Sequence, residues 1–407
     1  MYGHCVSHAL GEELYRNTPF SVSSHKGDQK ITFRSQRGRS LPLNIFSRYP
    51  VRLEATLANV QAQFDAFHET IKLKSFGENQ ELREKRDIIR KKLEKQLPGV
   101  FEAHGETCPA FHFRDQGSYE MHTGTKPLDD DFDIDQGLYF EVSTDDYLDP
   151  IILKQRVHEA LDGHTKDVRI RRPCVTVTYQ RDGESLYHVD IAVYSDGSKN
   201  TDGKSRLAKG RLNSLMENRV WEVSDPERLT ETIFARFTET DRRQFRHVVR
   251  YLKRWRDENF PSNGNAAPLG IGLTVATYDH LTPAYIDRFA GKTDDLKALR
   301  SVVDGMLGQF SLTWGSDAEQ WVRRLTVKLP ADPWSDLFVQ MTDTQMERFE
   351  SKLKQLQEAL DAAEVAVDPV EASETLRKVL GSDFPVPAKQ ETAKYHAPAI
   401  VSSSNSA

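Results

Sequence analysis

The spacing of apolar residues changes once along this chain of 407 residues, near residue 225, and that change constrains the fold more than any other feature. Before it, strand-like runs follow two helical segments. After it, apolar residues recur only at the three- and four-residue spacing of helices. This order predicts an α+β region with a mixed sheet, followed by a helical region. The strand-like runs are AFHFRDQG (110–117), FDIDQGLYFEV (132–142), VRIRRPCVTVTY (168–179) and SLYHVDIAVYS (185–195).

Helices are expected before and between the strand-like runs. The first covers 57–71, and the second covers 82–97 and should end at Pro98, because proline lacks the backbone donor that a helix needs. A third is expected at 150–162. These segments would pack on the sheet and form the first lobe, residues 57–225.

The second lobe, residues 226–387, is expected to be helical. Its stretch at 241–260 has apolar residues on one face and a basic set on the other. The stretch at 346–360 also has helical spacing, but it spans barely two heptads, which favours a bundle helix over a coiled coil.

Composition excludes several classes of protein. The 38% hydrophobic and 29% charged residues are typical of a soluble chain with a real core. No run approaches the roughly 18–20 apolar residues of a membrane helix, and no signal peptide is apparent. Three widely spaced cysteines indicate neither a disulfide framework nor a zinc knuckle, which favours a reducing, cytoplasmic setting.

The two ends of the chain differ from the rest. Residues 1–56 hold eight Lys/Arg and four Asp/Glu, which gives this segment a net charge of +4. Because the whole chain has a net charge of −6, the remainder has a net charge of −10. An acidic protein of this kind is not expected to coat nucleic acid. We expect 1–56 to be a dispensable extension upstream of a functional start near Leu57, and 388–407 to be a disordered tail.

Five aspartates crowd into seven residues at 129–135 and need an explanation, because crowded carboxylates resist ionising together. A solvated acidic turn explains residues 129–131. It does not explain Asp133 and Asp135, which alternate with apolar residues and would share one strand face, about 7 Å apart at Cα. Two such carboxylates can reach a pair of divalent cations held roughly 3.5–4 Å apart. Asp190, a lone charge in an apolar strand, is the expected third acid.

The same part of the sequence allows other interpretations. An EF-hand that begins at Asp131 would need glycine at its sixth position and glutamate at its twelfth, and it has neither. A structural salt bridge remains an alternative for Asp190. The segment GSKNTDGKS (197–205) resembles a phosphate-binding P-loop, but Ser198 stands where the first glycine belongs.

A Gly-Ser turn lies upstream of the acids. Gly117 and Ser118 follow a strand and precede a short helical segment, so the turn can direct backbone N–H groups and a hydroxyl at a phosphate.

Together, the Gly-Ser turn, the DID segment and the later aspartate resemble the polymerase-β-like nucleotidyltransferases. The segments DQGSYEMHTGTKPLDDDFDIDQGLYF, HVDIAVY, VSDPERL and RYLKRWRDENF narrow the resemblance to the cGAS/DncV-like nucleotidyltransferases (CD-NTases) of bacterial CBASS anti-phage systems. The similarity covers roughly 57–387. It implies a polymerase-β-like lobe with a central mixed sheet, an α-helical lobe, and an active site in the cleft between them.

The resemblance also implies roles for individual residues. The metal-binding catalytic acids of the family match Asp133, Asp135 and Asp190. The turn that holds the donor triphosphate matches Gln116, Gly117 and Ser118, and further nucleotide contacts match Ser224, Asp225 and Lys253. Two positions depart from the family: Thr176 stands where an arginine occurs, and Gly270 stands where a second base-contacting serine occurs. The departures leave the choice of bases open.

The function implied by the resemblance is the synthesis of a cyclic di- or trinucleotide from ATP- or GTP-type triphosphates with two Mg²⁺ ions, or Mn²⁺ in their place. The product would activate a downstream effector in anti-phage defence. No membrane and no stable nucleic-acid template would take part. Ubiquitin-transfer-like operon proteins would act on the C-terminus, Ala407. Two alternatives stay open: a template-free transferase that modifies RNA ends or proteins, and an inactive nucleotide-binding scaffold, which the intact acidic triad disfavours.

Overall fold

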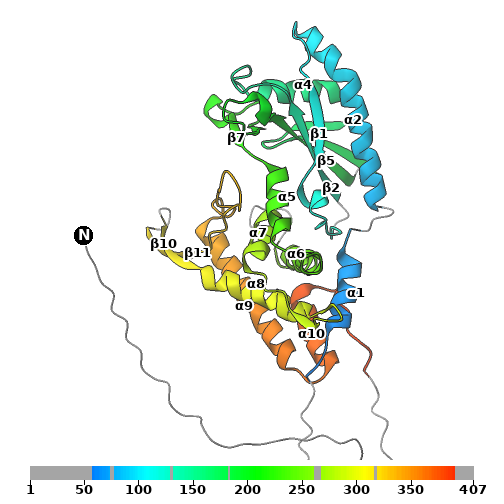
Figure 1. Ribbon diagram of the computed structural model, residues 1–407, viewed down its shortest axis with the longest axis vertical. Helices are drawn as coiled ribbons and strands as arrows, with labels where there is room; N and C mark the ends of the chain where they lie inside the picture. The colour runs from blue at the N-terminus through cyan, green and yellow to red at the C-terminus, as the bar shows by residue number, and fades with distance from the viewer. Residues whose placement is uncertain are drawn as a thin grey trace, which may run out of the picture. The chain divides into compact units, whose positions relative to one another are not determined.

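The computed structural model describes residues 57–73, 78–128, 132–181, 184–260, 267–315 and 319–389 (Figure 1). The chain divides into two units, Met1–Glu54 and Ala55–Ala407, and all described residues belong to the second. The predictions for 1–56, for the acidic residues 129–131 and for most of the C-terminal tail therefore lie outside the described residues.

A seven-stranded mixed sheet forms the first half of the second unit, which confirms the predicted α+β class. Its strands run in the order β1-β2-β5-β4-β3, while β6 pairs with β5, and β7 with β6. All pairs are antiparallel except β2 and β5, which run parallel. The strands are β1 (Phe111–Asp115), β2 (Phe132–Phe140), β3 (Asp167–Ile170), β4 (Val175–Arg181), β5 (Glu184–Ser195), β6 (Arg206–Lys209) and β7 (Val220–Val223).

Two long helices pack on this sheet, because each presents an apolar stripe to it (Figure 1). They are α2 (Glu78–Ala103) and α4 (Ile151–Leu161), and the single-turn α3 (Gly117–Glu120) and the 3₁₀ turns Gly197–Lys199 and Met216–Asn218 lie in the connections. The prediction that Pro98 ends the second helix was wrong, since α2 continues through it. Leu97 and Phe101 on either side are fully buried. Their burial outweighs the hydrogen bond that proline omits.

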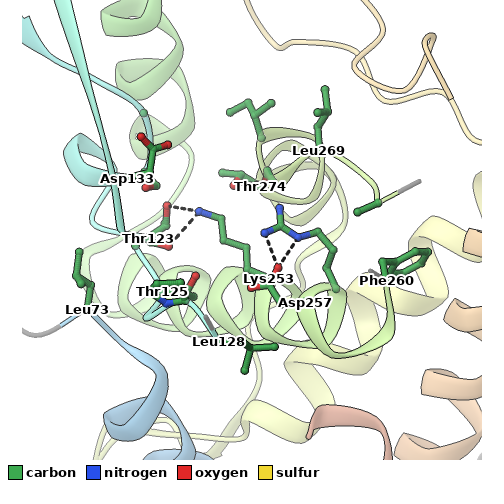
Figure 2. Close-up of a pocket in the computed structure, with 18 of the residues that line it drawn as sticks. Leu73, Thr123, Thr125, Leu128, Asp133, Lys253, Asp257, Phe260, Leu269 and Thr274 are labelled. Carbon is green, nitrogen blue, oxygen red and sulfur yellow. Dashed lines mark hydrogen bonds and ion pairs between the residues drawn. The ribbon is translucent and has the colours of Figure 1, made fainter. Parts of the chain in front are cut away.

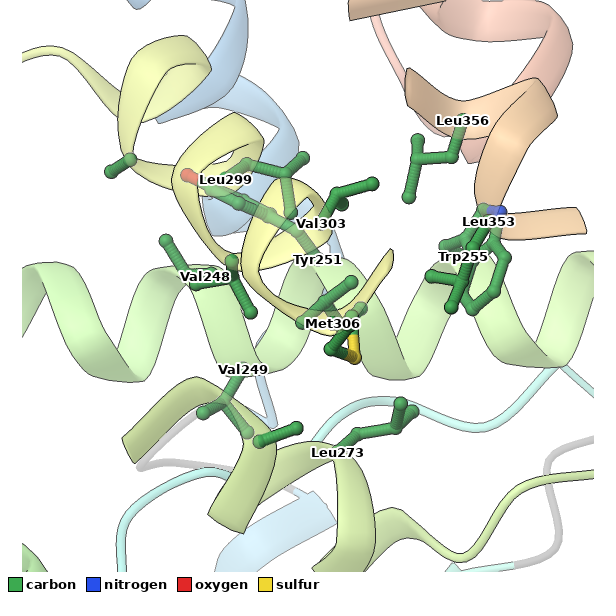
Figure 3. Packing of buried hydrophobic residues seen from close by; sticks show 14 of the residues in the cluster. Val248, Val249, Tyr251, Trp255, Leu273, Leu299, Val303, Met306, Leu353 and Leu356 are labelled. Atoms are coloured by element: carbon green, nitrogen blue, oxygen red, sulfur yellow. The ribbon is translucent and has the colours of Figure 1, made fainter. Parts of the chain in front are cut away.

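The helical half is organised around α6, whose apolar face lies against α7, α8 and α9 (Figure 3). Tyr251 and Trp255 of α6 are fully or almost fully buried there. The predicted bundle helix is α9, which packs between α8 and α10. The helices of this half are α5 (Pro226–Ala235), α6 (Glu239–Asn259), α7 (Gly270–His280), α8 (Asp295–Gln309), α9 (Asp343–Val365) and α10 (Pro369–Leu380).

Helix α1 (Gln61–Ile71) belongs to this second core rather than to the sheet. Phe64 and Phe67 have no exposed surface, and their rings lie 5.2 and 5.4 Å from that of Tyr251 on α6. The proposed boundary at residue 57 assigned this helix to the sheet lobe. Its aromatic face instead packs against α6.

Strands do not stop at residue 225, contrary to the prediction. Two short hairpins occur in the helical half: β8 (Tyr285–Asp287) with β9 (Lys292–Thr293), and β10 (Ser311–Gly315) with β11 (Gln320–Arg324). Trp314 and Trp321 face each other across the second hairpin. Such cross-strand pairs stabilise a hairpin too short to show a strand period in the sequence. No helix among the described residues is long and apolar enough to cross a membrane.

Candidate functional site

Three carboxylates meet where β2 and β5 lie side by side. The parallel register places Asp135 directly opposite Asp190, and Asp133 lies two residues earlier on the same face of β2. One ligand oxygen from each of the three lies within 4.8 Å of the others. The structure therefore brings together the three acids that the sequence singled out.

The surroundings of these acids favour a bound cation. Burial and the neighbouring Asp190 raise the pKa of Asp135 to about 6, and the charge of Lys253 opposes that shift to a lesser extent. Asp190 accepts a hydrogen bond of 2.5 Å from the Thr176 hydroxyl on β4. Thr176, noted as a departure from the family, thus holds a member of the acidic cluster. Three hard oxygen donors at this spacing suit Mg²⁺ or another oxygen-seeking divalent ion.

The Gly-Ser turn lies so close to Asp135 that a side chain at Gly117 would collide with its carboxylate. Gly117 has a φ of +68°, and a Cβ built there would lie 2.0 Å from Oδ2 of Asp135. Glycine is therefore required both by the backbone conformation and by the carboxylate. The turn continues into α3, and the Ser118 carbonyl accepts the Thr123 amide at 2.8 Å.

Lys253 reaches the site from the opposite side, on α6. Its ammonium donates to the carbonyl of Thr123 at 3.1 Å and to the Thr123 hydroxyl at 3.3 Å (Figure 2). Burial and the positive charges of Arg256 and Arg250 lower the pKa of Lys253 to about 7. It is a buried cation that an incoming anion would stabilise.

These residues line one cleft of about 1180 Å³. Gly117, Ser118, Asp133 and Asp135 form one wall, and Lys253 lies on the other. Figure 2 shows Asp133 and Lys253 facing the same space, with Thr123 between them. Ligand pockets typically measure about 300–1,000 Å³, so this cleft has room for more than one small molecule.

Ser224 and Asp225 line a second cavity of about 280 Å³ that shares Gly117 and Asp135 with the cleft. Asp225 also caps α5, because its Oδ1 accepts the Arg228 amide at 2.9 Å. The structure thus places this pair beside the cleft rather than in it.

Gln116 lines the same second cavity and is nine-tenths buried. Its side-chain oxygen accepts the Tyr194 hydroxyl at 3.3 Å. Gln116 therefore joins the turn to β5 in this structure.

Sequence reasoning missed the contacts that α6 makes through its basic residues. The amphipathic pattern assigned these residues to the face away from the core, yet Arg250, Lys253 and Arg254 are each at least nine-tenths buried. Arg250 donates to the Gly124 carbonyl at 3.0 Å and also to that of His122, and Arg254 donates to the Lys126 carbonyl at 2.8 Å. Only their spacing of three and four residues could have suggested a shared target.

Comparisons with known proteins agree with this geometry. Residues 111–194 match the model for the nucleotidyltransferase domain of the cyclic GMP-AMP synthase DncV-like family. A curated relative from Escherichia albertii, a cyclic GMP-AMP synthase, is 25% identical over 176 residues, which make up 41% of this chain. The matched part spans 36% of that relative's length.

Solved structures of Vibrio cholerae DncV share the fold over most of the described chain. DncV cyclic AMP-GMP synthase matches with a TM-score of 0.59 and 18% identity, over 80% of this chain and 97% of that one. Its complex with nonhydrolyzable GTP matches with a TM-score of 0.59 and 18% identity, over 82% of this chain and 100% of that one. Its complex with the linear intermediate 5' pppA(3',5')pG matches with a TM-score of 0.57 and 18% identity, over 81% of this chain and 98% of that one.

Proposed function

Because residues 111–194 of this chain form a DncV-like nucleotidyltransferase domain, we propose that the protein is a nucleotidyltransferase that makes a cyclic di- or trinucleotide from nucleoside triphosphates. The observation that carries the proposal is the carboxylate cluster of Asp133, Asp135 and Asp190, which opens onto a cleft large enough for two nucleotides. Each transfer joins a ribose hydroxyl of one nucleotide to the α-phosphorus of another and releases pyrophosphate.

The three carboxylates would hold the divalent cations, for which we propose Mg²⁺. When bound, these cations activate the attacking hydroxyl and neutralise charge on the triphosphate and the leaving pyrophosphate. Thr176 keeps Asp190 oriented toward Asp135 through its hydrogen bond. Asp133, the more exposed acid, faces the cleft where a triphosphate would enter.

The remaining residues bind and orient the substrates. Ser118 and the backbone of its turn would donate to the phosphates of the donor nucleotide, which the left-handed Gly117 allows to approach. Lys253 would contact phosphate from the opposite wall. A bound triphosphate would favour the charged form of the Lys253 ammonium, which burial disfavours. Ser224 and Asp225 are proposed to contact a base in the adjoining cavity, next to Gln116.

The biological setting follows the family resemblance. We propose that the cyclic product is a second messenger in a cytoplasmic CBASS anti-phage system and that it activates a downstream effector. This is supported by relatives described as cyclic GMP-AMP or cyclic AMP-GMP synthases. Conjugation of the C-terminus by ubiquitin-transfer-like proteins is proposed on the resemblance alone. The dispensability of residues 1–56 is proposed because they lie outside the resemblance and are basic where the remainder is acidic.

The test is incubation of the full-length protein with ATP, GTP and Mg²⁺, without RNA or another protein. A small product that resists phosphatase because it has no terminal phosphate, with release of pyrophosphate, is the expected result. Mass spectrometry would then identify its bases and ring size. Activity that needs an added RNA end or protein acceptor would favour the template-free transferase instead. No turnover with any acceptor would favour the inactive scaffold.

A further inference from the structure

Beyond Lys253 the cleft continues along α6 to an arginine that no part of the mechanism uses. Arg256 lies one helical turn after Lys253, lines the cleft and has a side chain that is 25% exposed. Its Nε and Nη2 donate to Oδ1 of Asp257 at 2.8 and 2.6 Å. Figure 2 shows both bonds converging on Asp257. They fix the plane of the guanidinium and leave its Nη1–Nη2 edge without a hydrogen-bond partner among the described residues.

Gly270, at the start of α7, makes room for this guanidinium. A Cβ at Gly270 would lie 2.9 Å from Nη1 of Arg256 and 3.7 Å from Cε of Lys253. A side chain at position 270 would therefore compete with the arginine for the same space. The glycine and the arginine form one feature of the cleft wall.

Exposed apolar side chains flank the same part of the cleft. Leu128 and Leu269 both line it, and each is 52% exposed. In the view of Figure 2 they lie on opposite sides of Lys253 and Asp257. Apolar side chains beside a fixed hydrogen-bonding group provide both surface and polarity for a flat ring such as a nucleobase.

We propose that Arg256 determines base specificity by donating from its Nη1–Nη2 edge to the N7 and O6 atoms of a guanine. This proposal deepens the proposed function and rests on it. Guanine presents two acceptors on that edge, whereas adenine presents an acceptor beside the donor of its N6 amino group. A fixed fork of two N–H groups therefore accepts guanine and rejects adenine.

A phosphate contact is the competing role for Arg256, and the charges disfavour it. Asp257 pairs directly with the guanidinium at 2.6 Å, so the pair presents donors with little net charge. Lys253 directs its hydrogen bonds to a carbonyl and a hydroxyl and keeps its charge for a phosphate. On the α6 wall, Lys253 would thus contact phosphate and Arg256 would contact the base.

Calorimetric titration of the full-length protein with nonhydrolysable GTP and ATP analogues, in Mg²⁺, tests this assignment. The parent should prefer the GTP analogue. Arg256→Gln should lower the affinity for the GTP analogue by about 10-fold to 100-fold, the range for loss of a bidentate arginine–guanine contact. It should change the affinity for the ATP analogue by less than about threefold. Arg256→Lys keeps the charge but loses the fork, so it should behave like Arg256→Gln. Gly270→Ser should weaken GTP binding by displacing Nη1.

The matched control is Arg348→Gln. Arg348 lines the same cleft, but its guanidinium lies over the Phe260 ring, 5.7 Å from the ring centroid. Its substitution should therefore leave the affinities for both analogues unchanged. Equal weakening of both analogues by Arg256→Gln, an unchanged affinity for both, or a parent that prefers ATP would overturn the proposal. Pyrophosphate release by the parent tests the proposed function separately. Turnover without a guanine preference contradicts only the role of Arg256, and a guanine preference without turnover contradicts only the enzymatic function.

Discussion

The two walls of the cleft carry opposite charges and stabilise them in different ways. On α6, Lys253 lines the cleft, and it donates, like Arg250 and Arg254 of the same helix, to backbone carbonyls of the 122–126 loop, so these cations are hydrogen-bonded inside the protein. On the sheet wall, three carboxylates lie within 4.8 Å of one another. Burial and the repulsion from Asp190 raise the pKa of Asp135 to about 6.

This difference indicates which wall depends on a ligand. The basic residues of α6 already have hydrogen-bond acceptors in the loop between the Gly-Ser turn and β2, although a bound phosphate would further stabilise the charge on Lys253. The sheet wall accumulates negative charge that only a cation relieves, as is typical of a site that stores unfavourable energy for function. Neutralising one of these carboxylates should therefore cost activity and spare stability.

The largest effect is expected from Asp135→Asn. Removing a buried carboxylate whose pKa is raised to about 6 should increase the stability of the metal-free protein at pH 7, by on the order of 1–2 kcal/mol. The gain should vanish below about pH 4, where the carboxyl is protonated in both the folded and the unfolded state. Product should fall by more than about 1000-fold.

Thermal melts across pH and pyrophosphate release check this prediction. Asp133→Asn should likewise keep or slightly raise the Tm, abolish product and remove the stabilisation by nucleotide and Mg²⁺. Asp130→Asn and the exposed Asp145→Asn are the controls and should stay within about threefold of parental activity. A clear loss of stability with turnover intact would instead assign Asp135 to a structural salt bridge.

The next effect concerns how closely the Gly-Ser turn approaches the acids. Gly117→Ala places a methyl group 2.0 Å from the Asp135 carboxylate, and the carboxylate must move. We expect about a 100-fold loss of kcat, the scale of a misplacement of about 1 Å. The control is Gly163→Ala, since Gly163 has a similar φ of +64° and nothing within 4 Å of its Cβ position. Both variants should lose about 1 kcal/mol from backbone strain, and only Gly117→Ala should lose activity.

The α6 wall is tested by a pH dependence of stability. Lys253 has a folded pKa lowered to about 7, so the unfolded chain binds more protons than the native protein between about pH 7 and 10. The stability of the parent should therefore rise with pH across that window. Lys253→Met removes this slope, and its difference from the parent in free energy of unfolding should be most favourable near pH 6 and decline toward pH 10.

Lys154→Met is the matched control for that measurement. Lys154 is also fully buried, donates to three backbone carbonyls and has its pKa lowered to about 8. It should show the same kind of pH slope. Only Lys253→Met should lose the increase in Tm that a nucleoside triphosphate produces. If both variants keep that increase, Lys253 does not contact phosphate.

The smallest effect is expected from the hydroxyl that orients Asp190. Thr176→Val should lower kcat by about 10-fold with little change in Tm, and Thr176→Ser should restore activity. Thr178→Val is the control, because Thr178 lies two residues along the same strand and contacts His188 instead. Equal losses in the two valine variants would show that β4 contributes packing alone.

Much of the site could be predicted from the sequence because its signals are local. Asp133 and Asp135 alternate with apolar residues, and this pattern indicates a strand with two acids on one face. Asp190 stands alone in an apolar run, and glycine followed by serine indicates a turn. Strand periods and turn chemistry depend on neighbouring residues, so a single sequence carries them.

The sequence by itself therefore determined the α+β class, the strands that carry the acids and the identity of those acids. Tertiary structure decided the rest. The parallel register of β2 and β5 placed Asp135 beside Asp190, the helical core took up α1, and packing in the core of the sheet carried α2 through Pro98. The basic face of α6 became buried because the carbonyls of the 122–126 loop accept its hydrogen bonds. Those acceptors lie more than 120 residues away in the chain, and a helical period shows which residues share a face but not what that face will meet.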